Sequence, residues 1–195
     1  MDHSPSLLAG LVLALRRRHL NPTRFILSIS VATQTMRLFE CTRDPRGEPS
    51  TTWLQPGWKV ALRKAYLIST SKYGVGQTVG SNQTPIGLHR VARKIGGGHP
   101  IGTVFRGRKP VGLTWRGLTD ASIVHRILWL EGLEPGHNSG GDVDTFRRYI
   151  YIHGFGDEPT LGRPSSHGCV HLAASDLLPL FDRVRLGTLV WIAER

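Results

Sequence analysis

Short apolar segments separated by turn-forming residues most constrain the fold of this chain. Its 195 residues include 23 glycines and 12 prolines, which interrupt the apolar runs at close intervals. Helices need apolar periodicity over roughly ten or more residues, whereas strands of roughly four to eight residues fit between such turns. The pattern therefore predicts a β-rich body rather than a helical bundle, in a chain long enough for one well-buried domain.

Seven stretches have the length and residue types of strands. The first two flank a short turn and predict a hairpin, whereas the cation- and glycine-rich segment 93–110 predicts an irregular loop or flap. Alternate residues of a strand share a face, so Ile150 and Ile152 should enter the core. Tyr149 and Tyr151 should then join His153 in lining a cleft. The expected strands cover residues 25–31, 36–39, 60–70, 88–92, 123–130, 147–153 and 188–193.

A helix is expected near the N-terminus. Its apolar run precedes Arg16-Arg17-Arg18, and cations favour a helix C-terminus. The run is shorter than the about 20 residues that span a bilayer, and its basic residues follow it, unlike those of a secretory signal. We therefore favour a helical segment, 1–22, packed on a domain, 23–195, over a degenerate membrane anchor. The apolar face comprises Leu7, Leu8, Leu11, Val12 and Leu15.

A second helix is expected after Cys169. Apolar residues recur there at helical spacing, Ser175 is a candidate cap, and Pro179 should lie within the first turn. Cys169 would then lie on a turn just upstream of this helix, where free backbone N–H groups can face an anion.

The net charge of +11 predicts either a solvated basic surface or attraction to a polyanion, such as an acidic envelope polymer. Nucleic acid is not an expected partner. The densest basic patches are not interleaved with aromatic residues, and the chain has no zinc-finger spacing. These patches are Arg16 to Arg18, and Arg106, Arg108 and Lys109.

A cysteine and several histidines gather near the C-terminus, as covalent acyl transfer requires. A free thiol with a pKa near 8.5 needs a neighbour to ionise at neutral pH. We assign Cys169 as the nucleophile and His153 as its base, because a strand can hold an imidazole in a fixed orientation; His167 is a second, local candidate. The Gly154 carbonyl can fix the imidazole tautomer, and the N–H groups of Gly168 and Cys169 can bind a developing oxyanion.

Other interpretations of these residues stay open. Ser166 is either a turn residue or a group that orients the site, and Cys41 is expected to be a small buried hydrophobe. Zinc is a rival, with three protein ligands and a water making a hydrolytic site. No carboxylate follows in a position suited to a general base, so we expect no metal. The candidate ligands are His153, His167, Cys169 and His171.

At these residues the chain resembles the L,D-transpeptidase catalytic domain, also called the YkuD domain. The resemblance extends from Phe25 to Ile192. Its landmarks are Gln34 before Met36-Arg37-Leu38, Thr84-Pro85-Ile86-Gly87, Tyr149 to Gly154, Ser166 to Cys169, and Gly187-Thr188-Leu189-Val190.

The resemblance implies a mainly β fold, a sandwich or flattened barrel with a few short helices. It implies that Cys169 attacks the carbonyl of the third residue of a peptidoglycan stem peptide and expels the terminal D-alanine, with His153 accepting and donating the proton. His167 and Gly168 would shape the oxyanion site. The amine of a second stem, or of an envelope lipoprotein, would resolve the thioester, and water would make the enzyme an L,D-carboxypeptidase. No cofactor is implied.

Further expectations concern substrate and location. We expect His171 and Tyr151 to contact substrate, although relatives often carry arginine or asparagine where His171 stands. The family implies the cell envelope or periplasm, yet no signal peptide is recognisable, and we expect a monomer. A cell-wall-binding module that has lost catalysis is an alternative, against which the intact cysteine and histidine set weighs.

Overall fold

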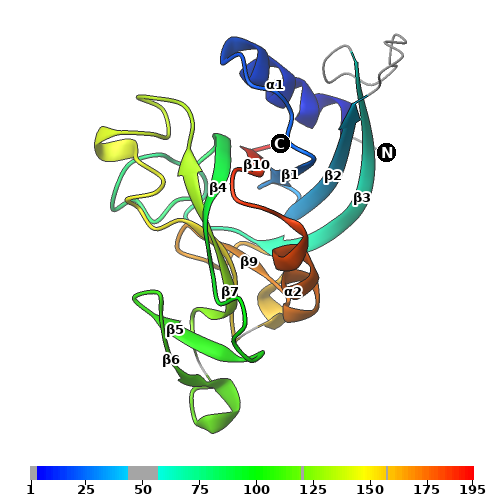
Figure 1. Ribbon diagram of the computed structural model, residues 1–195. Coiled ribbons are helices and arrows are strands. Elements are labelled where there is room, and N and C mark those ends of the chain that lie inside the picture. Colours follow the sequence, from blue (N-terminus) through cyan, green and yellow to red (C-terminus); the bar gives the residue numbers. More distant parts are fainter. Residues whose placement is uncertain (1–3, 44–56, 120, 157) are drawn as a thin grey trace.

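The computed structural model describes residues 4–43, 57–119, 121–156 and 158–195, with side chains from residue 9 onward. Eight strands pair in the order β4-β10-β1-β2-β3-β9-β8-β7, and pairing of β4 with β7 closes the sheet into a barrel (Figure 1). The mainly β prediction is confirmed, as a barrel. The barrel strands are β1 (Phe25–Ser30), β2 (Thr35–Arg43), β3 (Trp58–Ser69), β4 (Gly87–Ile95), β7 (Val124–Gly132), β8 (Tyr151–Gly154), β9 (Val170–Leu172) and β10 (Leu189–Ala193).

The barrel mixes parallel and antiparallel pairs. β1 and β2 form the predicted antiparallel hairpin, whereas β1 with β10 and β8 with β9 are parallel. The largest apolar cluster of the described residues joins these strands to the segment 177–184, and it includes Ile150 and Ile152, as the alternation predicted. Burial of these side chains holds β8 and its parallel neighbour β9 in fixed register, with His153 opposite His171.

The segment 93–110 is not the irregular loop that its glycines and cations suggested. β4 continues to Ile95, and an antiparallel hairpin of β5 (Thr103–Arg106) and β6 (Lys109–Leu113) follows. Gly107 and Arg108 form its tip with φ of 53° and 68°, the left-handed pair that a two-residue hairpin turn requires. This hairpin joins the barrel through β7 and projects from the end opposite α1 (Ser4–Arg17) in Figure 1.

The strand expected from residue 147 begins only at Tyr151. Tyr149 has a left-handed backbone, with φ of 58°, and its side chain is about half exposed, because it closes a turn in which its N–H donates to Phe146 O. Tyr149 therefore does not share a strand face with Tyr151 and His153, as the alternation had suggested.

Helix α1 covers one end of the barrel. Leu11, Val12 and Leu15 are buried against strand residues such as Ile26 and Leu88; the side chains of Leu7 and Leu8 lie outside the described part. Among the helices of the described residues, none has the length and apolarity needed to cross a membrane. The division of the chain at residue 22 stays a prediction.

The region after Cys169 differs from the expected turn and helix. Strand β9 follows Cys169 directly, and helix α2 (Ala174–Arg183) begins only after it. Ser175 lies inside the helix rather than at its cap, and Pro179 lies beyond the first turn. The α2 N-terminus is therefore not the group that faces Cys169. Short 3₁₀ turns occur at η1 (Thr114–Arg116), η2 (Gly141–Val143) and η3 (Glu158–Thr160).

Candidate active site

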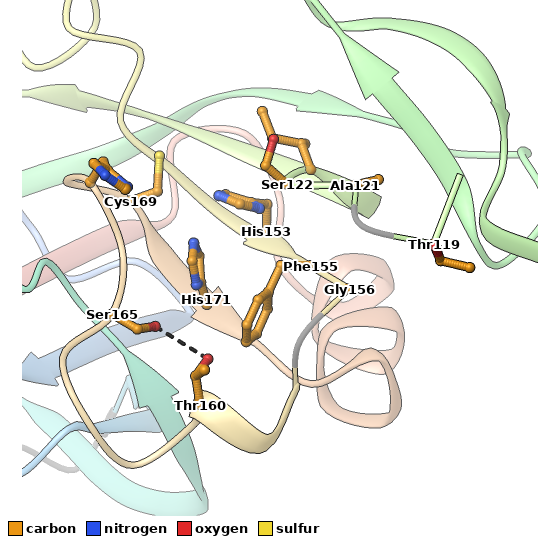
Figure 2. Close-up of a pocket in the computed structure, with 12 residues that line it drawn as sticks. Thr119, Ala121, Ser122, His153, Phe155, Gly156, Thr160, Ser165, Cys169 and His171 are labelled. Atoms are coloured by element: carbon orange, nitrogen blue, oxygen red, sulfur yellow. Dashed lines mark hydrogen bonds between the residues drawn. The ribbon is translucent and has the colours of Figure 1, made fainter. Parts of the chain in front are cut away.

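A cavity of about 700 Å³ opens beside the paired strands β8 and β9. Figure 2 shows Cys169, His153 and His171 around this cavity, with the imidazole of His153 extending toward Cys169. His167 also lines it, so the structure brings the thiol and all three histidines to one site. The rest of the lining comes from the segment before β7 and from the chain after β8. Its residues are Thr119, Ala121, Ser122, Ile123, Phe155, Gly156, Thr160 and Ser165.

Backbone groups surround the sulfur of Cys169. The Tyr151 N–H donates to Sγ at 3.4 Å, and the thiol donates to the carbonyl oxygen of Tyr149 at 3.5 Å. A carbonyl can only accept, so the second bond exists only while the thiol is protonated. Burial raises the pKa of Cys169 to about 11, although the Tyr151 N–H and the charge of Arg148 act to lower it.

The ring of His153 has a defined tautomer. Its Nδ1 donates to the carbonyl oxygen of Gly154 at 2.8 Å, as expected, which leaves Nε2 as the acceptor nitrogen of the neutral ring. The side chain is 2% exposed. Burial lowers the pKa of His153 to about 4, against the opposing effect of the Gly154 carbonyl.

The resting pair is therefore a neutral thiol and a neutral imidazole at pH 7. We had expected the neighbouring histidine to raise the thiolate population, but burial opposes both charges, and it raises the pKa of the thiol while it lowers that of His153. An imidazole in this state is suited to act as a general base, taking the proton as the sulfur forms a bond.

His171 is held mainly by its ring contacts. It stacks on Phe155 with ring centroids 4.2 Å apart and meets His153 edge-on at 4.9 Å. Burial, then the nearby His153 and His167, lower the pKa of His171 to about 3. Its Nδ1 is buried without a hydrogen-bond partner among the described residues, although other atoms of His171 line the cavity.

The turn that carries Cys169 is closed by Ser166. Ser166 Oγ donates to the Cys169 carbonyl at 2.6 Å and accepts from the Gly168 N–H at 3.2 Å. Gly168 has φ of 117°, and a Cβ there would lie 3.1 Å from Ile150 Cδ1 and 3.3 Å from the carbonyl oxygen of Gln83. Ser166 thus shapes the turn, and the Gly168 N–H that we had assigned to an oxyanion is occupied by it.

Tyr151 does not line the cavity, although its backbone contacts the sulfur. Its buried phenol accepts a hydrogen bond from Arg108 at 3.4 Å and packs edge-on against Trp129. Sequence reasoning missed Phe155, which stacks on His171, and Arg148, whose charge acts on Cys169. The sequence carries no signal of either role, since Phe155 has the pattern of a core aromatic residue and Arg148 that of a surface arginine.

The zinc alternative lacks a ligand set here. Within the part of the chain that the structure describes, no three His, Cys, Asp or Glu residues are grouped so that they could hold a metal ion. Cys41 and Cys169 are both free, and Cys41 is buried as expected of a small apolar residue.

Of three similar solved structures, Bd1075 supports the fold. Bd1075 from Bdellovibrio bacteriovorus matches over 89% of this chain and 49% of that one, with 13% identity and a TM-score of 0.53. The helical cell shape determining protein Pgp2 from Campylobacter jejuni matches over 90% of this chain and 48% of its own, with 17% identity and a TM-score of 0.49. An L,D-transpeptidase from Mycobacterium smegmatis matches over 87% of this chain and 58% of its own, with 13% identity and a TM-score of 0.47.

The chain thus spans about half to three-fifths of the length of these proteins. No curated protein matches it in sequence. The family model of the L,D-transpeptidase catalytic domain matches residues 46–192, well over half of the chain, and so begins after the β1–β2 hairpin that we had included in the resemblance. The cavity with its cysteine and histidines lies within the matched residues, and the chain belongs to the L,D-transpeptidase catalytic domain (YkuD) family.

Proposed function

We propose that the protein is a cysteine-dependent L,D-transpeptidase acting on peptidoglycan stem peptides, with Cys169 as nucleophile and His153 as base. One observation carries the proposal. The two side chains come from different elements to one cavity, and the Gly154 carbonyl leaves His153 Nε2 as a proton acceptor. The family implies peptidoglycan peptides as substrates and the cell envelope as the place of action.

The reaction is a two-step acyl transfer. As Cys169 Sγ forms a bond to the carbonyl carbon of the third stem residue, its proton passes to His153 Nε2. The same proton then goes to the nitrogen of the terminal D-alanine, whose bond to the carbonyl carbon breaks. In the second step an acceptor amine loses a proton to His153, attacks the thioester and releases the thiol.

The cavity offers polar groups for the substrate. We assign His171 and His167, which both line the cavity, to contacts with the substrate, with His167 beside the reacting carbonyl. The Cys169 N–H is the oxyanion donor; the Gly168 N–H joins it when Ser166 Oγ releases it. Tyr151 contributes its backbone N–H to Sγ rather than its phenol to the substrate.

Intact-mass measurement after incubation with imipenem tests the nucleophile. The strained lactam carbonyl of this carbapenem should acylate Cys169 once per molecule, and Cys169→Ala should abolish the adduct while leaving the circular dichroism spectrum unchanged. Cys41→Ala is the matched control and should react like the wild type, because Cys41 is buried and burial raises its pKa to about 12. Folded, reduced protein that forms no adduct would contradict the proposal.

Product analysis then identifies the acceptor. With a tetrapeptide stem and an amine acceptor, a transpeptidase yields a cross-linked product, an L,D-carboxypeptidase yields only the tripeptide, and a cell-wall-binding module yields neither. We expect the cross-link. An envelope lipoprotein is a further candidate acceptor in this proposal. The proposal also includes a monomeric protein, which sedimentation of the purified protein tests.

A further inference from the structure

The side chain of Arg148 is half-buried and has no role in the reaction as proposed. It lies in the turn just before β8, and its guanidinium donates four hydrogen bonds. All four acceptors are uncharged, and all lie in one loop, residues 76–83, which we name the support loop. The acceptors are Gly76 O at 3.0 Å, Gln77 O at 2.9 Å, Ser81 Oγ at 3.3 Å and Gln83 O at 2.6 Å.

The support loop is closed at its base by the bridge between Val75 and Thr84. From this base, Thr84 Oγ1 donates to the carbonyl oxygen of Gly168 at 3.1 Å. The carbonyl oxygen of Gln83, which accepts from Arg148, is also the atom that a Cβ on Gly168 would meet at 3.3 Å. A continuous set of contacts therefore runs from Arg148 through the support loop to the residue preceding Cys169.

The charge of Arg148 is not neutralised by an acid. Ion pairs among the described residues join other cations to Glu40, Asp176 and Glu131, and no carboxylate of that part of the chain pairs with Arg148. A half-buried cation without a counter-ion exerts a stronger field on its neighbours than one exposed to water. This field acts on Cys169. The charge of Arg148 lowers the pKa of the thiol, which burial raises, and the thiolate raises the pKa of Arg148, which burial lowers.

We propose that Arg148 is a positioning residue for Cys169: its guanidinium fastens the support loop, which contacts the residue preceding Cys169, and its unpaired positive charge favours loss of the thiol proton. The inference rests on the proposed function, because it matters for catalysis only if Cys169 is the nucleophile. The planar fork of arginine suits this place, since it reaches several carbonyl oxygens at once, whereas lysine carries a single point charge.

The test measures the rate of Cys169 alkylation by iodoacetamide between pH 7 and pH 9, with intact-mass detection. A rise of about one pKa unit on removing a nearby cation lowers the thiolate fraction about tenfold. The higher nucleophilicity of the more basic thiolate recovers about threefold of this, so alkylation should slow about threefold. We expect this slowing in Arg148→Met at pH 8. Arg148→Lys keeps the charge and should alkylate at nearly the wild-type rate. Arg147→Met is the matched control, because Arg147 is an exposed neighbour, and it should alkylate like the wild type.

A merely structural role gives a different result. If Arg148 only braces the loop, Arg148→Met and Arg148→Lys should behave alike, and a loosened site should alkylate faster rather than slower; either result overturns the proposal. Should Arg148→Met not fold by circular dichroism, Arg148→Gln replaces it as an uncharged side chain that still hydrogen-bonds. A wild type that imipenem does not acylate refutes the proposed function, while the alkylation rates still decide the role of Arg148.

Discussion

Replacing His153 with glutamine should separate two kinds of reactivity at Cys169. Burial raises the pKa of the thiol to about 11 and lowers the pKa of His153 to about 4, so the resting pair is uncharged from about pH 4 to about pH 11. Alkylation by iodoacetamide needs a thiolate already present, whereas acylation by imipenem can use His153 to remove the proton during attack. The substitution should therefore impair acylation and leave alkylation nearly unchanged.

The magnitudes follow from these pKa values. At pH 7 a thiol of pKa about 11 is ionised to about one part in 10⁴, against roughly 3% for a free thiol of pKa about 8.5. The higher intrinsic nucleophilicity of the more basic thiolate recovers about tenfold of this roughly 300-fold deficit. Cys169 should thus alkylate about 30-fold more slowly than free cysteine, and His153→Gln should change this rate by less than about threefold. Acylation by imipenem should fall by about 10²–10⁴, the usual contribution of a general base.

Stopped incubations of wild type and His153→Gln, followed by intact mass, measure both rates on the same samples. The alkylation rate of the wild type should rise tenfold per pH unit up to pH 9, since only the thiolate reacts. A rate that instead reaches a plateau below pH 7, and drops strongly in His153→Gln, would mean that the two residues form a thiolate–imidazolium ion pair. That result would refute the argument that burial keeps both groups neutral.

Two further predictions concern stability, measured by urea denaturation. Burial lowers the pKa of the fully buried His89 to about 3, below the 6.5 of its unfolded state, so the unfolded chain binds more protons as pH falls. Between pH 7 and pH 5 the free energy of unfolding of the wild type should therefore fall by about 2 kcal/mol more than that of His89→Gln. Equal losses would refute this. Gly154→Ala should lower the free energy of unfolding by about 1–3 kcal/mol, because its Cβ would lie 2.5 Å from His125 Cδ2 and 2.8 Å from Val124 O. Gly97→Ala, whose Cβ meets its nearest neighbour at 3.5 Å, is the control, and a similar loss there would contradict the steric argument.

The sequence predicted the barrel strands well because their apolar residues alternate over regular, extended backbone. Ile150 and Ile152 are buried as that alternation required. Alternation failed at Tyr149, where a left-handed residue ends a turn, because nothing in the side chain marks so uncommon a backbone state. The tip of the β5–β6 hairpin at Gly107 and Arg108 was missed because a cation-rich segment looked like a solvated loop.

For the candidate site, the sequence could indicate which residues have the right chemistry, but it could not indicate their protonation. Local spacing singled out Cys169 and His153, and the family match covers both. The neutral state of this pair depends on burial of both side chains, which only the folded chain produces. Arg148 acts through a loop some seventy positions earlier, which local spacing cannot reveal.

The parallel pairing of β8 with β9 has a consequence for how this scaffold can diversify. His153 lies on one of these strands, and Cys169 immediately precedes the other, so their separation follows from the inter-strand spacing of about 4.8 Å and not from the length of the connection between them. That connection carries Thr160 and Ser165, which form part of the cavity wall. Grafted or resized connections can therefore change the wall of the cavity while leaving the distance between Cys169 and His153 intact.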